Sequence, residues 1–370
     1  MKIKPFEIER YFARYEFSAP YLLSSSDCEP LSLQELLKLA DKQSLKLWHN
    51  LSLGYTESQG NPILRKEVAK LYKNVKSDEI LIGAPQELIT IAMNVLLKTN
   101  DHVIVTYPGY QSLYEVANAL GCYVTKWMLD ENNDWNLNLE FLKKSINNNT
   151  KLIVVNFPHN PTGYLPTKKE FLAILKIAKE KNIPVFSDEM YRFLEYKQED
   201  MLPGACEVYN NAISLFGMSK TFGLPGLRMG WLVIKNKGIL QKCLEFKDYT
   251  TICPNAPSEI LALMGLRAKD KIVKRNLGII NTNLKILDKF FQNNKLFTWN
   301  RPKAGSVCFP KYLGKQTTTK LCKGLVDKKG VMMLPSYVFG IDNKHVRIGF
   351  GRKNMPQVIK LLENYLRKTI

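Results

Sequence analysis

The sequence lacks the features that would assign it to a membrane or exported protein. None of its 370 residues belongs to an uninterrupted apolar run of about 18, so we expect no membrane span. The N-terminal residues contain no apolar stretch typical of a signal peptide. We therefore expect a cytoplasmic protein.

Cysteine and histidine are also scarce. The seven cysteines are scattered, odd in number and without a CxxC pair, which favours free thiols. The four histidines show no metal-ligand spacing, so we predict no metal site.

Acidic residues are too few to balance the basic ones, and the formal net charge is +19. Such a charge can indicate nucleic-acid binding. However, the lysines are spread along the whole chain, and their clusters are short, with few aromatic residues between them. We predict solvated lysine-rich helix faces and no nucleic-acid partner, and keep a nucleic-acid-binding protein as an outside alternative.

Between about residues 60 and 235, short apolar segments alternate with helical patterns. The apolar segments are Glu79–Ile82, Val103–Thr106, Leu152–Asn156, Pro184–Ser187, Ile213–Phe216 and Trp231–Ile234, and helical patterns cover Gln86–Leu97, Ser112–Leu120 and Lys168–Lys181. Buried strands that alternate with helices predict a three-layer α/β fold with a mostly parallel sheet.

The pattern changes after about residue 280. A long helical stretch leads to Phe291, short β-like segments follow, and Met355–Lys368 has a helical pattern. We predict a large domain over residues 41–279 and a smaller α+β domain that both chain ends form, from residues 1–40 and 280–370.

Polar, aromatic or glycine residues follow five of the predicted strands. These segments are Gly83–Glu87, Tyr107–Tyr110, Phe157–Gly163, Asp188–Tyr191 and Gly217–Arg228. In an open parallel sheet, ligands bind beyond the carboxyl ends of the strands. The five segments therefore predict one binding crevice.

Four motifs in this order resemble those of the fold-type-I, class I/II aminotransferase family. They are N-P-T-G at Asn160–Gly163, D-E-x-Y at Asp188–Tyr191, S-K-T-F-G-L-P-G-L-R at Ser219–Arg228 and R-I-G-F at Arg347–Phe350. The resemblance implies a PLP-dependent transferase-like fold, pyridoxal 5'-phosphate (PLP) as cofactor, and amino-group transfer from an L-amino acid to a 2-oxo acid.

The chemistry of PLP explains the first two site residues. A lysine can hold the cofactor as an imine and move a proton at the substrate Cα, which we assign to Lys220. A buried carboxylate keeps the pyridine nitrogen protonated, which fits Asp188. By resemblance, Tyr191 and Asn160 bind the ring oxygen, and Tyr110 stacks on the ring.

The phosphate needs fixed donors. The segment Gly83-Ala84-Pro85-Gln86 leads from a strand into a helix whose free amides would face the phosphate. Arg228 would add a charged fork, and we include Ser219 among the cofactor-binding residues.

The resemblance also names residues for the substrate and for a second subunit. Arg347 matches the arginine that binds the substrate α-carboxylate, and we place Asn160 and Ser25 beside it. Tyr55 matches a tyrosine that reaches the phosphate of the neighbouring subunit, and Asn255 falls where a partner loop usually lies. These matches predict a homodimer with a shared active site.

The chain departs from the family pattern at three places. Gly217 stands where many members have a phosphate-binding serine, and Pro85 stands where many have a hydrogen-bonding residue. The segment from Tyr21 to Glu29 replaces a glycine-containing stretch beside the substrate. Its serines, with Asp27 and Glu29, could recognise a polar or cationic amino acid.

Several reactions remain open at this stage. The same fold and cofactor support decarboxylation, β-elimination, cyclisation and oxidation through the same carbanion, and a non-catalytic PLP-binding protein is a further alternative.

Overall fold

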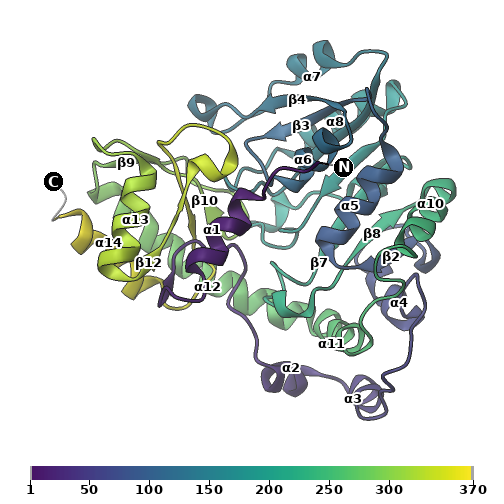
Figure 1. Ribbon diagram of the computed structural model, residues 1–370. Helices are drawn as coiled ribbons and strands as arrows, with labels where there is room; N and C mark the ends of the chain where they lie inside the picture. Colours follow the sequence, from purple (N-terminus) through teal and green to yellow (C-terminus); the bar gives the residue numbers. More distant parts are fainter. Residues whose placement is uncertain (1, 368–370) are drawn as a thin grey trace.

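The computed structural model describes residues 2–367, and its largest feature is a seven-stranded sheet (Figure 1). Its strands are β2 (Ile80–Gly83), β3 (His102–Tyr107), β4 (Tyr123–Met128), β5 (Thr150–Asn156), β6 (Val185–Asp188), β7 (Ala212–Gly217) and β8 (Gly230–Ile234). They lie in the order β2-β8-β7-β6-β5-β3-β4. Only β8 runs against the others, being antiparallel to both β2 and β7. The predicted mostly parallel α/β sheet is confirmed.

Six of the seven strands coincide with the apolar segments predicted from the sequence. The seventh, β4, was not predicted, because it lies at the edge of the sheet and pairs only with β3. Most of its side chains are exposed or half-buried, so it has no continuous apolar run.

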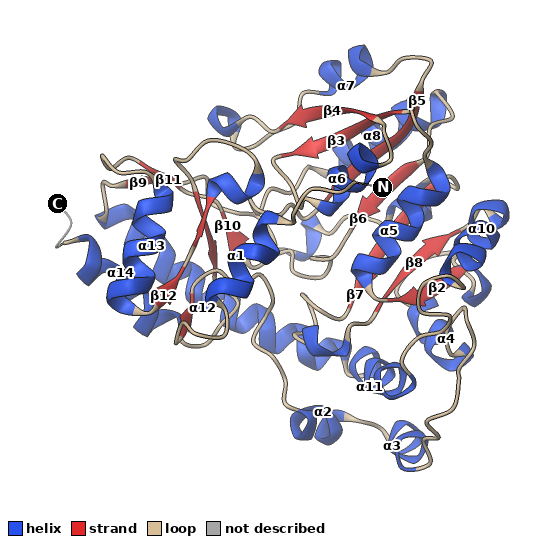
Figure 2. Ribbon diagram, viewed as in Figure 1, coloured by secondary structure: helices blue, strands red, loops and turns tan. Residues whose placement is uncertain are grey.

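Helices cover both faces of this sheet (Figure 2). Leu152 and Val154 of β5 pack in one core cluster with residues of α5 (Pro85–Leu96) and α6 (Ser112–Ala119). The alternate residues Ile153 and Val155 pack in a second cluster with α8 (Lys168–Glu180). Since neighbouring strand residues point to opposite faces, the sheet is the middle of three layers. The other helices of this part are α4 (Pro62–Ala69), α7 (Leu139–Ser145), α9 (Ala205–Val208), α10 (Lys237–Lys247) and α11 (Ala256–Arg267).

The two ends of the chain meet in smaller sheets. The N-terminal strand β1 (Tyr21–Leu22) pairs in parallel with β12 (Val331–Met332). Beside them, β14 (Val346–Gly349) lies between β10 and β13. The remaining elements here are α1 (Glu7–Tyr15), β9 (Phe297–Thr298), β10 (Val307–Cys308), β11 (Lys311–Tyr312), α13 (Thr318–Lys329), β13 (Leu334–Pro335) and α14 (Met355–Leu366). The predicted C-terminal helix thus ends at Leu366, and Lys368 lies outside the described residues.

The predicted domain boundaries fall among helices that have contacts in both predicted domains. The long helix α12 (Lys269–Asn293) runs from α11 to the small sheets (Figure 1). Helix α2 (Leu33–Leu39) packs against α11, although it precedes the predicted boundary at residue 41. The division into residues 41–279 and the two chain ends stays a prediction.

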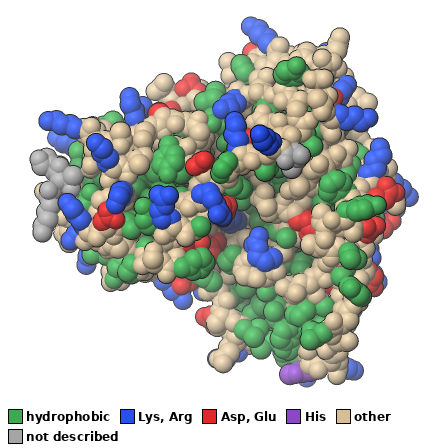
Figure 3. All heavy atoms as spheres, viewed as in Figure 1, with side chains coloured by type: hydrophobic (Ala, Val, Ile, Leu, Met, Phe, Trp, Pro, Cys, Tyr) green, Lys and Arg blue, Asp and Glu red, His purple; other side chains and the backbone are tan. Residues whose placement is uncertain are grey.

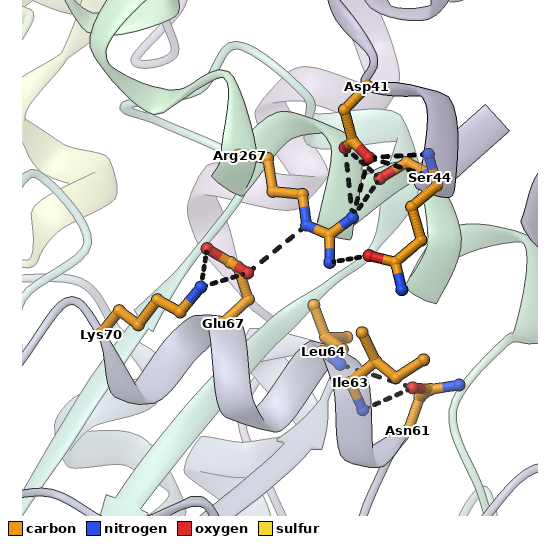
Figure 4. Close-up of polar contacts among 9 residues, drawn as sticks. Asp41, Ser44, Asn61, Ile63, Leu64, Glu67, Lys70 and Arg267 are labelled. Atoms are coloured by element: carbon orange, nitrogen blue, oxygen red, sulfur yellow. Dashed lines mark hydrogen bonds and ion pairs between the residues drawn. The ribbon is translucent and has the colours of Figure 1, made fainter.

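A polar cluster anchors the segment around α3 (Lys42–His49) to α11 and α4 (Figure 4). Arg267 Nη1 donates to Asp41 Oδ1 at 3.1 Å, and Arg267 Nε donates to Glu67 Oε2 at 3.4 Å. Asn61 caps α4 by accepting the amide of Ile63 at 2.8 Å. The loop between α3 and α4, which carries Tyr55, is therefore held at both ends.

Within residues 2–367, every helix is too short or too polar to cross a lipid bilayer. The seven cysteines are free thiols, as predicted.

Candidate active site

A cavity of about 500 Å³ lies where the carboxyl ends of β5, β6 and β7 meet the N-terminal segment and β14. It brings together eleven of the residues singled out in the sequence. They are Ser25, Pro85, Gln86, Tyr110, Asn160, Asp188, Tyr191, Ser219, Lys220, Arg228 and Arg347. Gly83 and Ala84 adjoin it as the end of β2 and the N-cap of α5.

Lys220 follows β7 and points its amine into this cavity. Its Nζ donates to the hydroxyl of Ser26 at 2.7 Å. Burial lowers the pKa of this amine, and the neighbouring Arg347 and Arg228 lower it further, against the opposing effects of Asp27 and Glu9. The amine is thus shifted towards its neutral, nucleophilic form.

The backbone around Lys220 is held by three distant segments. The amide of Cys28 donates to the Lys220 carbonyl at 3.2 Å. The Thr221 hydroxyl donates to the carbonyl of Arg192 at 2.7 Å, and Asn276 Nδ2 donates to the Thr221 carbonyl at 2.9 Å. These bonds fix the position from which the lysine side chain starts.

Asp188 is the last residue of β6 and is buried, with 5% of its surface exposed. Its Oδ1 accepts the amide of Met190 at 3.1 Å. Burial raises the pKa of Asp188 to about 7, although the Met190 amide and Lys220 act in the opposite direction. A carboxyl group in this state has no full counter-charge and fits a cationic ligand atom.

Arg347 and Asn160 meet in the same cavity. Arg347, on β14, is 2% exposed, and its Nη1 donates to Asn160 Oδ1 at 3.1 Å. Its Nη2 donates to the carbonyl of Ser24 at 2.8 Å, while its buried Nε has no partner among residues 2–367. The hydroxyl of Tyr191 is likewise buried and without a partner in the described chain. Buried donors of this kind indicate a polar ligand.

The N-terminus of α5 forms another edge of the cavity, and its packing links the two departures from the family pattern. A side chain at Gly217 would begin 2.9 Å from the backbone of Gly230 and Met229 and 3.3 Å from the ring of Pro85. The same ring lies 2.8 Å from the place of a Cβ at Gly230. Pro85 and the two glycines therefore form one packing unit that leaves no space for a serine at position 217.

The remaining predicted cofactor residues lie around this edge. Arg228 is exposed at the rim, and its Nη1 donates to the Pro225 carbonyl at 3.0 Å. Ser219 is buried in the cavity wall. Gln86 Oε1 is buried without a partner within residues 2–367.

Tyr55 and Asn255 lie away from the cavity of their own chain. Tyr55 is 89% exposed on the loop between α3 and α4. Asn255 is exposed and caps α11 by accepting the amide of Ser258 at 3.0 Å.

The N-terminal segment lines the cavity in a way that the sequence suggested only in part. Asp27 is buried in the wall, and both its oxygens accept from Arg352 Nη2 at 3.0 Å. Glu29 lies outside the cavity lining, and its Oε2 accepts the amide of Lys353 at 2.8 Å. The idea that both carboxylates recognise the substrate is therefore wrong for Glu29.

Sequence reasoning missed several residues of the lining. Helix α1 contributes four, which we call the α1 wall: Ile8, Glu9, Phe12 and Glu16, the last being its C-cap. Asn156 and Arg352 were also missed, whereas Ser26 belongs to the serine-containing segment singled out in the sequence. Of these, only Asn156 carried a usable signal, because it ends a predicted strand. Asn156, Asn160, Asp188, Tyr191 and Lys220 form the opposite side, which we call the sheet wall.

A buried ionic network supports the sheet wall from behind. Glu189 accepts from Arg192 Nη1 at 3.2 Å, from the Ser214 hydroxyl at 2.7 Å and from the Ala205 amide at 2.9 Å. Arg192 also lies over the ring of Tyr72, 4.9 Å from its centroid. The network joins the turn after Asp188 to β7, the strand that precedes Lys220.

Known proteins resemble this chain over nearly its whole length. The family described as aminotransferase class I and II matches residues 22–363. An aspartate aminotransferase from Sulfolobus acidocaldarius is 32% identical over 318 residues, which cover 80% of this chain and 78% of the relative. The structure of a PLP-dependent aminotransferase from Streptococcus suis 89-1591 is 31% identical, with a TM-score of 0.93 over 100% of this chain and 99% of that one. The structure of the PLP-dependent cyclase OrfR is 25% identical, with a TM-score of 0.91 and the same coverage.

These similarities establish that the chain belongs to the aminotransferase class I and II family. It is a PLP-dependent aminotransferase, with an amino acid and a 2-oxo acid as substrates. The cavity fits this cofactor, because an amine of lowered pKa, a buried carboxyl group and unpartnered polar atoms of Gln86, Tyr191 and Arg347 all line it. The fold, cofactor and enzyme class predicted from the sequence are thus confirmed.

Proposed function

We propose that the chain moves the amino group of an L-amino acid to a 2-oxo acid in this cavity, with Lys220 as the Schiff-base lysine. The observation that carries the proposal is the convergence of three groups. The Lys220 amine, the Asp188 carboxyl and the Arg347 guanidinium all line one cavity of about 500 Å³.

Lys220 and Asp188 divide the chemistry between them. PLP, when bound, withdraws the electrons that are left at the substrate Cα when its proton departs. Lys220 Nζ removes that proton, for which its lowered pKa suits it. Asp188, as a buried carboxylate, holds a proton on the pyridine nitrogen. Tyr191 would donate its unpartnered hydroxyl to the ring oxygen, Asn160 of the same lining would assist, and Tyr110 would stack on the ring.

Other residues of this chain orient the two ligands. Arg347 binds the α-carboxylate, because its buried Nε has no partner within residues 2–367. The bonds from Nη1 to Asn160 and from Nη2 to the Ser24 carbonyl hold the guanidinium in position. Ser25 lines the same side. At the other end, the amides that begin α5, with Gln86, Ser219 and Arg228, would bind the phosphate. Since Pro85 has no N–H and Gly217 no hydroxyl, Arg228 carries more of this task.

The test is a half-reaction screen. The purified protein is reconstituted with PLP and mixed with single amino acids, with and without 2-oxoglutarate, while cofactor absorption and products are followed. We expect the donor to convert the cofactor once without the oxo acid and repeatedly with it. Failure of every amino acid to change the cofactor spectrum would contradict the proposal.

A second candidate reaction is supported by the similarity to the PLP-dependent cyclase OrfR. Cyclisation, β-elimination and oxidation would start from the same proton removal by Lys220, whereas decarboxylation would form the carbanion by loss of the α-carboxylate as CO2. The screen separates these reactions, because each of them would release product continuously without any oxo-acid acceptor.

We also propose a homodimer with a shared active site. Hydrophobic side chains gather at the lower end of the face in Figure 3, over α2 and α3. Leu53, Tyr55, Tyr249 and Ile252 are 83%, 89%, 92% and 52% exposed, which is costly for an isolated chain. Sedimentation should therefore give twice the mass of 42.5 kDa. In such a dimer, Tyr55 would reach the partner's phosphate, and Tyr55→Phe would weaken PLP binding several-fold, by about one hydrogen bond.

The cytoplasmic location and the domain boundaries at residues 41 and 280 are retained as proposals on the sequence grounds given above. Cell fractionation and limited proteolysis would test them.

A further inference from the structure

The α1 wall presents a mixed surface to the cavity. Helix α1 lies between the large sheet and the small sheets (Figure 1). Ile8, Phe12 and Glu16 are spaced four residues apart, so they share one face of the helix, with Glu9 beside them. Two apolar side chains are therefore flanked by two carboxylates.

The charges of the cavity lining do not balance once each group has its proposed task. The lining contains four basic side chains, Lys220, Arg228, Arg347 and Arg352, and four acidic ones, Glu9, Glu16, Asp27 and Asp188. Lys220, Arg228, Arg347 and Asp188 serve the cofactor and the α-carboxylate. Of the remaining four, Arg352 is paired with Asp27 at 3.0 Å. Within residues 2–367, Glu9 and Glu16 are thus left without an ion-pair partner, and interact with the cations of the lining only over a longer distance.

Neither glutamate is used by the fold within residues 2–367. No hydrogen bond or ion pair of this part of the chain involves the side chain of Glu9 or Glu16, whereas Asp27 and Glu29 are both bound. Glu16 moreover caps the C-terminus of α1, where the helix dipole disfavours a carboxylate and favours a cation. Burial, with Glu9 and Asp27, raises the pKa of Glu16, against the opposing effects of Lys220 and Arg352.

An independent observation shows where a ligand would sit. The Nε of Arg347 is buried in the same cavity and has no partner among the described residues. A substrate carboxylate bound there, with its amino group towards Lys220, would direct its side chain to the rest of the lining, where the α1 wall stands.

We propose that the amino donor carries a positively charged group on an aliphatic stem, as lysine, ornithine and arginine do. The stem packs on Ile8 and Phe12, and the charged end is bound by Glu9 and Glu16. This substrate class rests on the proposed function. It differs from the acidic substrate in the name of the aspartate aminotransferase relative.

The experiment compares donors that differ in one group. Holoenzyme is mixed with L-lysine, L-ornithine, L-arginine, L-glutamate or L-norleucine, which has the stem of lysine without its terminal amine. The rate of the first half-reaction is measured at donor concentrations far below saturation. Binding is measured separately by spectral titration of PLP-loaded Lys220→Ala, which cannot turn the donor over.

We expect at least one cationic donor to react about tenfold faster than norleucine and glutamate, and to bind more tightly in proportion. Glu9→Gln and Glu16→Gln should each reduce the ratio of the cationic donor's rate to the norleucine rate by roughly fivefold, the range of a partly solvated ion pair. The matched control is Glu7→Gln, which removes the same charge from the same helix outside the cavity lining. High salt should weaken the preference.

Two results would overturn this substrate class while transamination stands. Norleucine or glutamate would react as fast as all three cationic donors, or the preference would be unchanged in both glutamine variants. If instead no amino acid altered the cofactor spectrum, the proposed function itself would fall, and the substrate class with it.

Discussion

The two sides of the cavity are built on different principles. In the sheet wall, Asp188 and Lys220 stand at strand ends, are desolvated, and have pKa values shifted by burial. Behind them, a network of buried bonds fixes the backbone. In the α1 wall, Glu9 is exposed, Glu16 is half-buried, and neither is bound by the rest of the described chain.

The difference follows from what each side does. Proton transfer needs groups with matched pKa values held in one geometry, and burial in a rigid sheet supplies both. Recognition of a side chain needs only complementary charge and shape, which a helix at the rim can provide while it stays solvated. The sheet wall should therefore respond to mutation in rate and stability, and the α1 wall in donor preference.

The largest effect should come from Lys220→Ala. Loss of the amine removes both the covalent attachment of PLP and the proton acceptor at Cα. We expect kcat to fall by at least roughly 10²–10⁴-fold, the contribution of a positioned acid–base group. Steady-state assays measure the rate, and absorption spectra report the lost Schiff base. The exposed Lys242→Ala serves as control, and a wild-type rate for Lys220→Ala would refute the assignment.

The next largest effect should come from Asp188→Asn, which we expect to change how the free energy of unfolding depends on pH. The pKa of Asp188 is about 7 in the folded chain, above its ordinary value of 3.8. Between these two values the unfolded chain releases a proton that the folded chain retains, so the contribution of Asp188 to stability is lost as pH rises. Without cofactor, the stability of wild type should fall relative to the variant by about 2–4 kcal/mol between pH 4 and pH 7.5.

Thermal unfolding at the two pH values measures this difference. Saturation with PLP supplies the missing counter-charge and should stabilise wild type more than Asp188→Asn. Equal pH dependence of the two cofactor-free proteins would show that Asp188 is not a buried acid of raised pKa, and would weaken the contrast between the two sides.

The sheet wall could largely be predicted from the sequence, because four of its five residues lie in local motifs that follow predicted apolar strands, and only Asn156, at the end of such a strand, lies outside them. Asn160, Asp188 and Lys220 needed no knowledge of distant contacts. The α1 wall could not be predicted, since nothing in the sequence around Glu9 and Glu16 indicates that α1 faces Lys220. The bond between Ser26 and Lys220 joins residues 194 positions apart. The edge strand β4 was missed for a different reason, because its exposed side chains hide the strand pattern.

The sequence also showed Pro85 and Gly217 as two separate departures. Only their packing reveals that they belong together, with Gly230 as a third member. A local pattern cannot show this, because the three residues come from α5, β7 and β8.

The buried network behind the sheet wall should respond to Glu189→Gln. Glu189 and Arg192 are both almost fully buried, so removal of one charge leaves the other poorly compensated. We expect unfolding to require about 3 kcal/mol less, towards the lower end of such effects, because Glu207 still lies 3.4 Å from Arg192. Denaturant titration measures the loss. The control is Glu140→Gln, which removes the exposed ion-pair partner of Lys143 and should change the free energy of unfolding little. Equal losses in the two variants would argue against the buried network as a support of the sheet wall.

The smallest effect should come from Gly217→Ser, which restores the serine of the family pattern. The new Cβ would meet the backbone of Gly230 and Met229 at 2.9 Å, closer than side-chain atoms normally approach. Because backbone atoms cannot move away as the end of a flexible side chain can, we expect the free energy of unfolding to fall by about 1–2 kcal/mol. We expect no gain in PLP affinity. Pro85→Ala with Gly217→Ser should recover little stability, because the backbone contact remains. Denaturant titration and PLP titration test both statements. Tighter PLP binding by the serine variant at unchanged stability would show that the cavity edge at the N-terminus of α5 is as adaptable as the α1 wall. The contrast between a rigid side and an adaptable side of the cavity would then hold only for Asp188 and Lys220.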